Sequence, residues 1–213
     1  MNGGPANPLG DGGIAIHNWM FKQKSFLEHL ELKGGEDNNK DNDIITETFN
    51  RIGANIMGKK MFIEGEANWP EKAPFGVPVH VLTHQKRDPW ERKGGTTFFF
   101  TDDNIYDVLE RAKKDAGSKD VRISGGAYTI QQYLNAGLID ECSIHQAPIM
   151  LGKGVRLFEN MDIEKFSFQI TDVINSEYVT YLNYKILKQN LKDSICKEYS
   201  NDRRKNTHQT PGW

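Results

Sequence analysis

Two adjacent glycines, Gly125 and Gly126, stand where an apolar segment at residues 121–124 gives way to an amphipathic one. A strand that turns directly into a helix leaves the first N–H groups of that helix unpaired and next to a partial positive charge. Since glycine has no Cβ atom, a phosphate group can approach these N–H groups closely. A tight connection without any ligand fits the same residues. The candidate phosphate-binding residues of this turn are Ser124, Gly125, Gly126 and Ala127.

A second glycine turn follows the apolar residues 54–57, where Gly58 precedes Lys59 and Lys60. One helix terminus contributes about 0.3–1 kcal/mol per interaction, whereas micromolar affinity requires about 8 kcal/mol. A dinucleotide therefore needs more than one such turn, and Gly58, Lys59 and Lys60 are candidates for the second. A solvated lysine pair at a helix start is the alternative. Residues 53–60 nearly match the nucleotide triphosphate loop, but Lys60 stands where that loop needs a hydroxyl group for magnesium.

A third candidate position is the end of the apolar strand predicted at residues 77–83, where Thr83 and His84 could hold a ribose phosphate. Polar residues after a strand usually face water. In open α/β sheets, however, ligands bind beyond the carboxyl ends of the strands, and three candidate strand ends fall in one predicted sheet. The pattern therefore favours a nucleotide-type ligand at one edge.

Other chemistries find little support in the sequence. His80 and His84 are four residues apart, but the segment between them is strand-like and lacks the glutamate of a zinc helix, so we expect no metal site. No serine-hydrolase elbow is present, and neither cysteine, Cys142 or Cys196, lies in a nucleophile motif. The sequence identifies no catalytic acid or base.

The composition of the 213 residues fits one ordinary domain. Its 27 basic and 29 acidic residues are interspersed and give a net charge of -2, so nucleic acid is not an expected partner. There is no apolar run long enough to span a membrane and no signal-peptide pattern at the start, so we expect a cytoplasmic protein. Its two cysteines are expected to be free thiols. The expected ligand is a small-molecule substrate.

The candidate residues must be positioned by alternating strands and helices, followed by a strand-rich end. This order predicts one α/β domain over residues 7–188, with a mixed, mostly parallel central sheet, an antiparallel C-terminal edge and helices on both faces. The polar residues 189–213 are expected to form a disordered tail. The expected helices begin near His17, Ile44, Gly58, Asp102 or Asp103, and Gly126. The expected strands cover residues 54–57, 77–83, 96–101, 121–124, 141–149, 155–158, 166–174 and 179–187.

Several segments together resemble one known family, the C-terminal reductase domain of the bifunctional riboflavin deaminase-reductase. The matching segments are residues 123–127 (ISGGA), 131–134 (QQYL), 137–141 (GLIDE) and 147–154 (APIMLGKG), with 56–62 (IMGKKMF) and 81–83 (VLT) upstream. The resemblance covers roughly residues 7–187 and is closest to stand-alone dihydrofolate reductase-like proteins of that family.

This resemblance implies a three-layer dihydrofolate reductase-like fold and an NADPH-dependent reductase acting on a pterin-like or ribosylaminopyrimidine substrate, in the manner of 5-amino-6-(5-phosphoribosylamino)uracil reductase. It also implies that Leu151 and Gly152 approach the cofactor, and that the protein forms a homodimer. The candidate substrate contacts are Trp19, Glu47 and Trp69, for which packing or solvated positions are the alternatives. The competing hypothesis is a non-catalytic dinucleotide-binding or assembly domain.

Two positions depart from the pattern of the family. The family usually opens with an apolar strand ending in an Asp-Gly signature, and residues 1–6 do not supply it, so we expect the domain to lack its usual first strand. Lys59 stands where arginine is common, which keeps the positive charge but loses the two-pronged hydrogen-bonding geometry.

Overall fold

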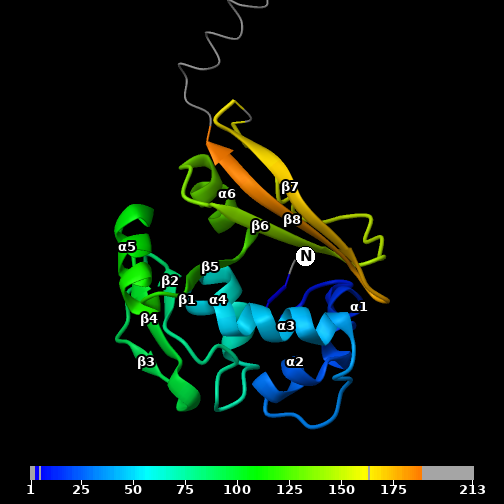
Figure 1. The fold of residues 1–213 in the computed structure, drawn as a ribbon. Helices are drawn as coiled ribbons and strands as arrows, with labels where there is room; N and C mark the ends of the chain where they lie inside the picture. Colours follow the sequence, from blue (N-terminus) through cyan, green and yellow to red (C-terminus); the bar gives the residue numbers. More distant parts are fainter. Residues whose placement is uncertain (1–2, 5, 163, 189–213) are drawn as a thin grey trace, which may run out of the picture.

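The computed structural model describes residues 3–4, 6–162 and 164–188. The expected tail at residues 189–213, which includes Cys196, lies outside the described residues. Two β-sheets and the helices around them make up the fold (Figure 1). No helix among the described residues is both long and apolar enough to cross a membrane.

The first sheet has five strands in the order β3-β4-β2-β1-β5. They are β1 (Ile52–Gly58), β2 (Val79–Leu82), β3 (Trp90–Glu91), β4 (Thr97–Thr101) and β5 (Asp120–Gly125). Neighbouring strands are parallel except for β3, which pairs with β4 in the antiparallel sense. The central strand β1 is buried along almost its whole length, as its unbroken, mostly apolar sequence predicts for a parallel strand covered on both faces.

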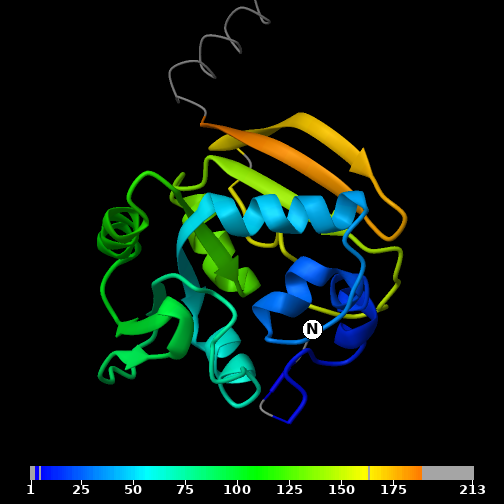
Figure 2. The ribbon, with the colours of Figure 1, turned by 60° about the horizontal axis from the view of Figure 1, so that its bottom comes forward.

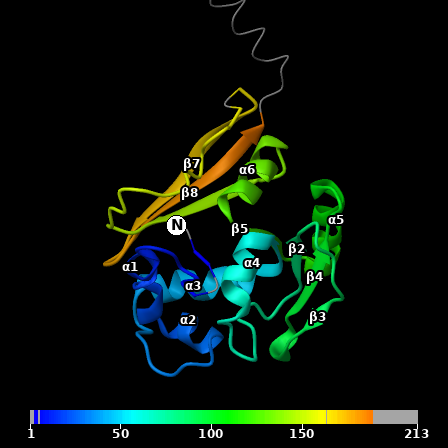
Figure 3. The same cartoon turned by 180° about the vertical axis from the view of Figure 1, so that it is seen from behind.

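Helices cover both faces of the first sheet, as expected. On one face, Ala54 and Ile56 pack against α5 (Ile105–Ala116) and Tyr133 of α6 (Ala127–Asn135). On the other face, Met57 packs with Phe62 of α4 (Lys59–Glu66) and the aromatic residues around it. Successive residues of β1 therefore point into two different cores, and Figure 3 shows the two helices α4 and α5 beside the strands.

The second sheet is antiparallel, in the order β6-β8-β7. Its strands are β6 (Glu141–Gln146), β7 (Phe166–Asn175) and β8 (Thr180–Lys188). Figure 2 shows α3 (Lys40–Arg51) running alongside this sheet, where Ile45 packs with Trp19 and Tyr181. The parallel centre and the antiparallel end are confirmed, but the antiparallel strands form a sheet of their own instead of one edge of a single sheet.

Two local predictions were wrong, and one short strand was missed. The helix expected from His17 onward is divided into α1 (Gly13–His17), the short 3-10 helix η1 (Met20–Lys22) and α2 (Lys24–His29). Gln23 is extended there because residues 22 and 24 bond through their backbones to Glu36. Residues 155–158 form no strand, and the short strand β3, with the 3-10 helix η2 (Lys93–Gly95) after it, was not foreseen.

Candidate functional site

The candidate turns meet at one edge of the first sheet. The register pairs Gly58 with Leu82, Met57 with Gly125, and Leu82 with Thr101. Because these strands are parallel, the segments that follow β1, β2, β4 and β5 all leave the sheet at its carboxyl edge. The structure therefore brings together the three strand ends that the sequence singled out as candidates.

The two glycine turns are in direct contact. A Cβ atom on Gly58 would lie 2.5 Å from Thr129 Oγ1 and 3.8 Å from the carbonyl oxygen of Gly125. Gly125 has a φ of 129°, which side chains rarely tolerate, and is joined to Gly126 by a cis peptide bond. Gly58 thus has no room for a side chain, and the backbone conformation of Gly125 disfavours one, so bare backbone forms both turns.

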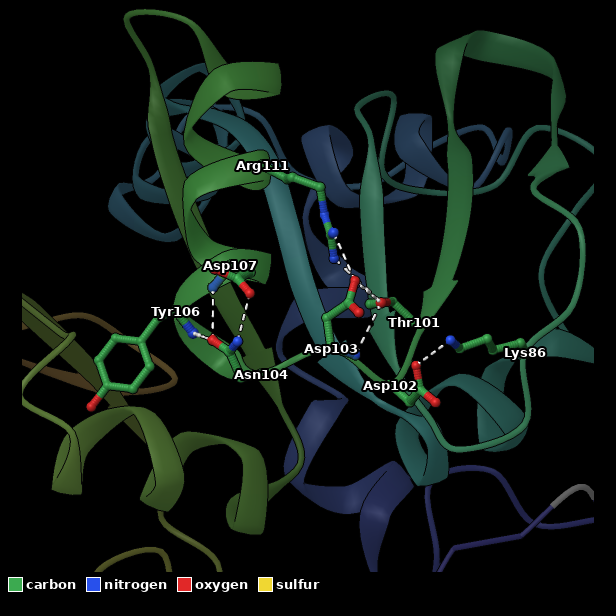
Figure 4. Close-up of polar contacts among 8 residues, drawn as sticks. All are labelled: Lys86, Thr101, Asp102, Asp103, Asn104, Tyr106, Asp107 and Arg111. Carbon is green, nitrogen blue, oxygen red and sulfur yellow. Dashed lines mark hydrogen bonds and ion pairs between the residues drawn. The ribbon is translucent and has the colours of Figure 1, made fainter.

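Three helices begin at this edge, and their first turns differ. Asn104 caps α5 by accepting hydrogen bonds from the backbone N–H groups of Tyr106 and Asp107, each at 3.0 Å (Figure 4). No side chain caps α4, which follows Gly58, or α6, which follows Gly126. At the starts of α4 and α6, no side chain takes the backbone N–H groups that an anion would need. At the start of α5, the side chain of Asn104 already binds them.

The cap of α5 corrects the expectation that Asp102 or Asp103 would fill this position. Asp102 instead forms an ion pair with Lys86 at 2.6 Å, and Asp103 forms one with Arg111 at 2.7 Å (Figure 4). The hydrogen bond from Lys86 lowers the pKa of Asp102. The hydrogen bonds from Thr101 and Arg111 lower the pKa of Asp103.

Lys59 is a basic group at the edge that forms no ion pair in the described part of the chain. Lys60, by contrast, lies 3.8 Å from Glu64. Arg87, beyond the end of β2, pairs with Glu66 at 2.7 Å. Lys59 can therefore offer its charge to a bound anion without first breaking a salt bridge.

The hydroxyl groups at the edge are held in fixed positions. Thr83 is buried, its N–H donates to the carbonyl of Thr101 at 2.8 Å, and its Oγ1 accepts from the N–H of Gln85. Ser124 Oγ donates to Asn55 Oδ1 at 2.8 Å. His84, by contrast, is exposed.

Leu151 lies against the N-terminal segment. A Cβ atom on Gly12 would lie 2.4 Å from Leu151 Cδ2, and Lys153 forms an ion pair with Asp11 at 3.0 Å. Within the described residues, no hydrogen bond or ion pair joins Leu151 or Gly152 to the glycine turns. Their approach to a cofactor stays a prediction.

The three candidate substrate residues are scattered. Trp19 is buried against His145 and Tyr181, with ring centroids 5.7 and 5.9 Å away. Trp69 stacks on the ring of Phe98 within the core below α4. Glu47 is an exposed residue of α3. A hollow of about 390 Å³ between α2, α3 and residues 72–76 contains none of the three.

The sequence reasoning missed a polar cluster between β5 and β6. Arg122 Nε donates to Asn55 Oδ1 at 2.8 Å and to Ser124 Oγ at 3.2 Å. The Tyr181 hydroxyl donates to the buried Asp41 carboxylate at 2.5 Å, and His145 lies beside Tyr181. The available signal was an arginine inside an otherwise apolar strand pattern.

This topology, with parallel strands ending at two glycine turns and a separate antiparallel sheet, defines a dihydrofolate reductase-like α/β domain. The family model described as the RibD C-terminal domain matches residues 11–180, and the chain belongs to this family. The RibD C-terminal domain is a reductase domain. The family is associated with riboflavin biosynthesis.

The chain is also similar to individual known proteins. A putative riboflavin biosynthesis protein from Shewanella sp. PV-4 is 25% identical, with a TM-score of 0.54 over 67% of this chain and 78% of that one. RibD from Acinetobacter baumannii is 22% identical, with a TM-score of 0.47 over 64% of this chain and 47% of that one. The uncharacterised protein YyaP from Bacillus subtilis is 41% identical over 59 residues, which span 28% of this chain and 31% of YyaP.

Proposed function

We propose that this protein is an NADPH-dependent reductase of a pterin-like or ribosylaminopyrimidine substrate. The observation that carries the proposal is the contact between two glycine turns, each followed by a helix without a side-chain cap. Two such helix starts, side by side at the carboxyl edge of a parallel sheet, suit the two linked phosphates of a dinucleotide.

In this proposal, different residues of the edge bind different parts of the cofactor. Gly58 and residues 124–127 offer backbone N–H groups to the phosphates, and Lys59 and Lys60 add positive charge. Thr83 and His84, at the end of β2, are proposed to contact the ribose phosphate. When bound, the cofactor supplies the hydride. The protein orients the cofactor against the substrate and excludes water, which requires no strong protein acid.

The remaining contacts are proposed from the family resemblance. Leu151 and Gly152 approach the cofactor from the segment after β6, and Trp19, Glu47 and Trp69 are candidate substrate contacts. Trp19 is the best placed of these three, because it adjoins the polar cluster between β5 and β6 through His145.

The first test is a titration of the protein with NADPH and, separately, NADH, following the fluorescence of its four tryptophans. Saturable quenching that favours NADPH would support the proposal, and oxidation of NADPH with a pterin or aminopyrimidine would then establish the activity. Binding without turnover on either substrate class would favour a non-catalytic dinucleotide-binding or assembly domain. Absence of binding to both cofactors would overturn the proposal.

We also propose a cytoplasmic homodimer over the domain at residues 7–188. Ile170 and Val173 of β7 are large apolar side chains exposed on one face of the second sheet, and a second copy would cover them. A monomeric mass in light scattering would contradict the dimer.

A further inference from the structure

Arg122 is held in a fixed orientation by two neutral side chains. Its Nε donates to Asn55 Oδ1 and Ser124 Oγ, while Ser124 Oγ also donates to Asn55 Oδ1. Asn55 lies on β1, and the other two residues lie on β5, so two neighbouring strands set the plane of the guanidinium group. Only Nε takes part in this triangle, so the two terminal nitrogens have no part in these hydrogen bonds.

No protein anion neutralises this guanidinium group. In the described part of the chain, Arg122 has no salt bridge, and no hydrogen bond reaches its terminal nitrogens. Burial lowers the pKa of Arg122 to about 10, so the group stays charged at neutral pH. A buried cation without a counter-charge is costly to keep, and such groups are concentrated at functional sites.

The terminal nitrogens of Arg122 are also not sealed from solvent. Among the described residues, the fully buried side-chain atoms without a partner are Gln23 Oε1, Glu64 Oε1 and Arg92 Nε, and no atom of Arg122 is among them. The guanidinium group is thus half-buried, and its terminal nitrogens keep some exposure to solvent.

The groups across from Arg122 do not compete for it. The pKa of His145 on β6 is lowered, first by burial; the charge of Asp41 raises it and the charge of Arg122 lowers it further. Asp41 already accepts a hydrogen bond from Tyr181. Arg122 therefore brings to this polar cluster a positive charge that no carboxylate contacts among the described residues.

We propose that Arg122 is a substrate-binding residue that receives an anionic oxygen group through the fork of its terminal nitrogens. Arg122 lies two residues before Ser124 on β5, so both side chains are on the same face of the strand. Arg122 therefore adjoins the turn at residues 124–127 that is proposed to bind the cofactor phosphates. The inference rests on the proposed function in taking this ligand to be the substrate. A carboxylate and a phosphate share the required chemistry, and the test separates them.

The test uses three ring compounds that differ in one group: benzoate, phenyl phosphate and neutral benzamide. Their binding is measured by the shift of the thermal unfolding midpoint and by tryptophan fluorescence, for the full chain and for Arg122→Met, Arg122→Lys and Arg156→Met. Arg156 is exposed, with no ion pair in the described part of the chain, and gives the matched control.

We expect at least one anionic probe to bind to the unchanged chain and to Arg156→Met, with an affinity at least tenfold lower in Arg122→Met and intermediate in Arg122→Lys. Benzamide should not depend on Arg122. The preferred anion identifies the group as a carboxylate or a phosphate. Equal binding of both anions to all four proteins, or binding to none of them, would overturn the proposal.

A purely structural role for Arg122 predicts a different result. Asn55 and Ser124 keep their own hydrogen bond in Arg122→Met, and the uncompensated charge is removed, so this variant should unfold at the same or a higher temperature than the unchanged chain. A lower unfolding temperature with unchanged anion binding would assign Arg122 to structure alone. NADPH titration of the same proteins keeps the two proposals apart, because Arg122→Met should bind NADPH as the unchanged chain does.

Discussion

Gly58 and Thr129 are packed so closely that a methyl group on Gly58 would lie 2.5 Å from the Thr129 hydroxyl oxygen. The backbone of Gly58, with φ −82° and ψ 154°, is a conformation that any residue can adopt. Space alone therefore requires glycine here. The contact ties the turn before α4 to the first turn of α6, so that the two proposed phosphate-binding turns keep a fixed separation.

Gly58→Ala should destabilise the protein by about 1–3 kcal/mol, the usual cost of adding a methyl group to a packed site, and should also weaken NADPH binding. Urea unfolding and cofactor titration measure the two effects. The double variant Gly58→Ala with Thr129→Ala removes the clashing oxygen and should recover most of the stability. If the double variant is as unstable as the sum of the single variants, the contact does not limit residue 58.

Asn104→Ala should cost about 1 kcal/mol of stability through loss of the cap of α5, without changing the affinity for NADPH. The reason is that the two backbone hydrogen bonds that Asn104 Oδ1 accepts serve the helix itself. Asp102→Ala is the matched control from the same segment and should cost less, since Asp102 pairs with Lys86 at the surface. If Asp102→Ala lost more stability than Asn104→Ala, Asp102 would be the residue that caps α5, as one of the two expected from the sequence.

The two glycine turns could be predicted because their signals are local. An apolar segment, a glycine and an amphipathic segment follow one another in the chain, and parallel pairing then places such strand ends at one edge. The cap of α5 could not be chosen in the same way. Asp102, Asp103 and Asn104 are all good capping residues, and the choice depends on Lys86 and Arg111, which take the two carboxylates.

The role of Arg122 depends on parts of the chain that are distant in sequence. An arginine in a strand usually marks an exposed position, and nothing near residue 122 shows that Asn55 of β1 will hold its Nε. The division into two sheets is likewise decided by pairing, because the individual strands β6, β7 and β8 have the patterns that a single sheet would also need.

His80 should make the stability of the protein depend on pH below neutrality. Burial lowers the pKa of His80 more than its hydrogen bond to Asp115 raises it. Between the unfolded pKa of about 6.5 and the lowered folded pKa, the unfolded chain binds more protons, so stability falls as the pH falls through this window. Urea unfolding from pH 5 to 8 should show a shallower acid slope for His80→Gln, and parallel slopes would contradict the assignment.

Lys59 and Lys60 should differ in their contribution to cofactor binding, although they are neighbours. Lys59 has no ion pair in the described residues, whereas Lys60 lies 3.8 Å from Glu64, which offsets part of its charge. Lys59→Met should therefore weaken NADPH binding by about tenfold or more, the effect of losing one charged hydrogen bond, and Lys60→Met by less. Because ionic contacts at an open edge are screened by salt, the affinity of Lys59→Met should also fall less steeply with sodium chloride. An equal or larger effect of Lys60→Met, in titrations at several salt concentrations, would show that the phosphates lie nearer to Lys60 than to the start of the helix.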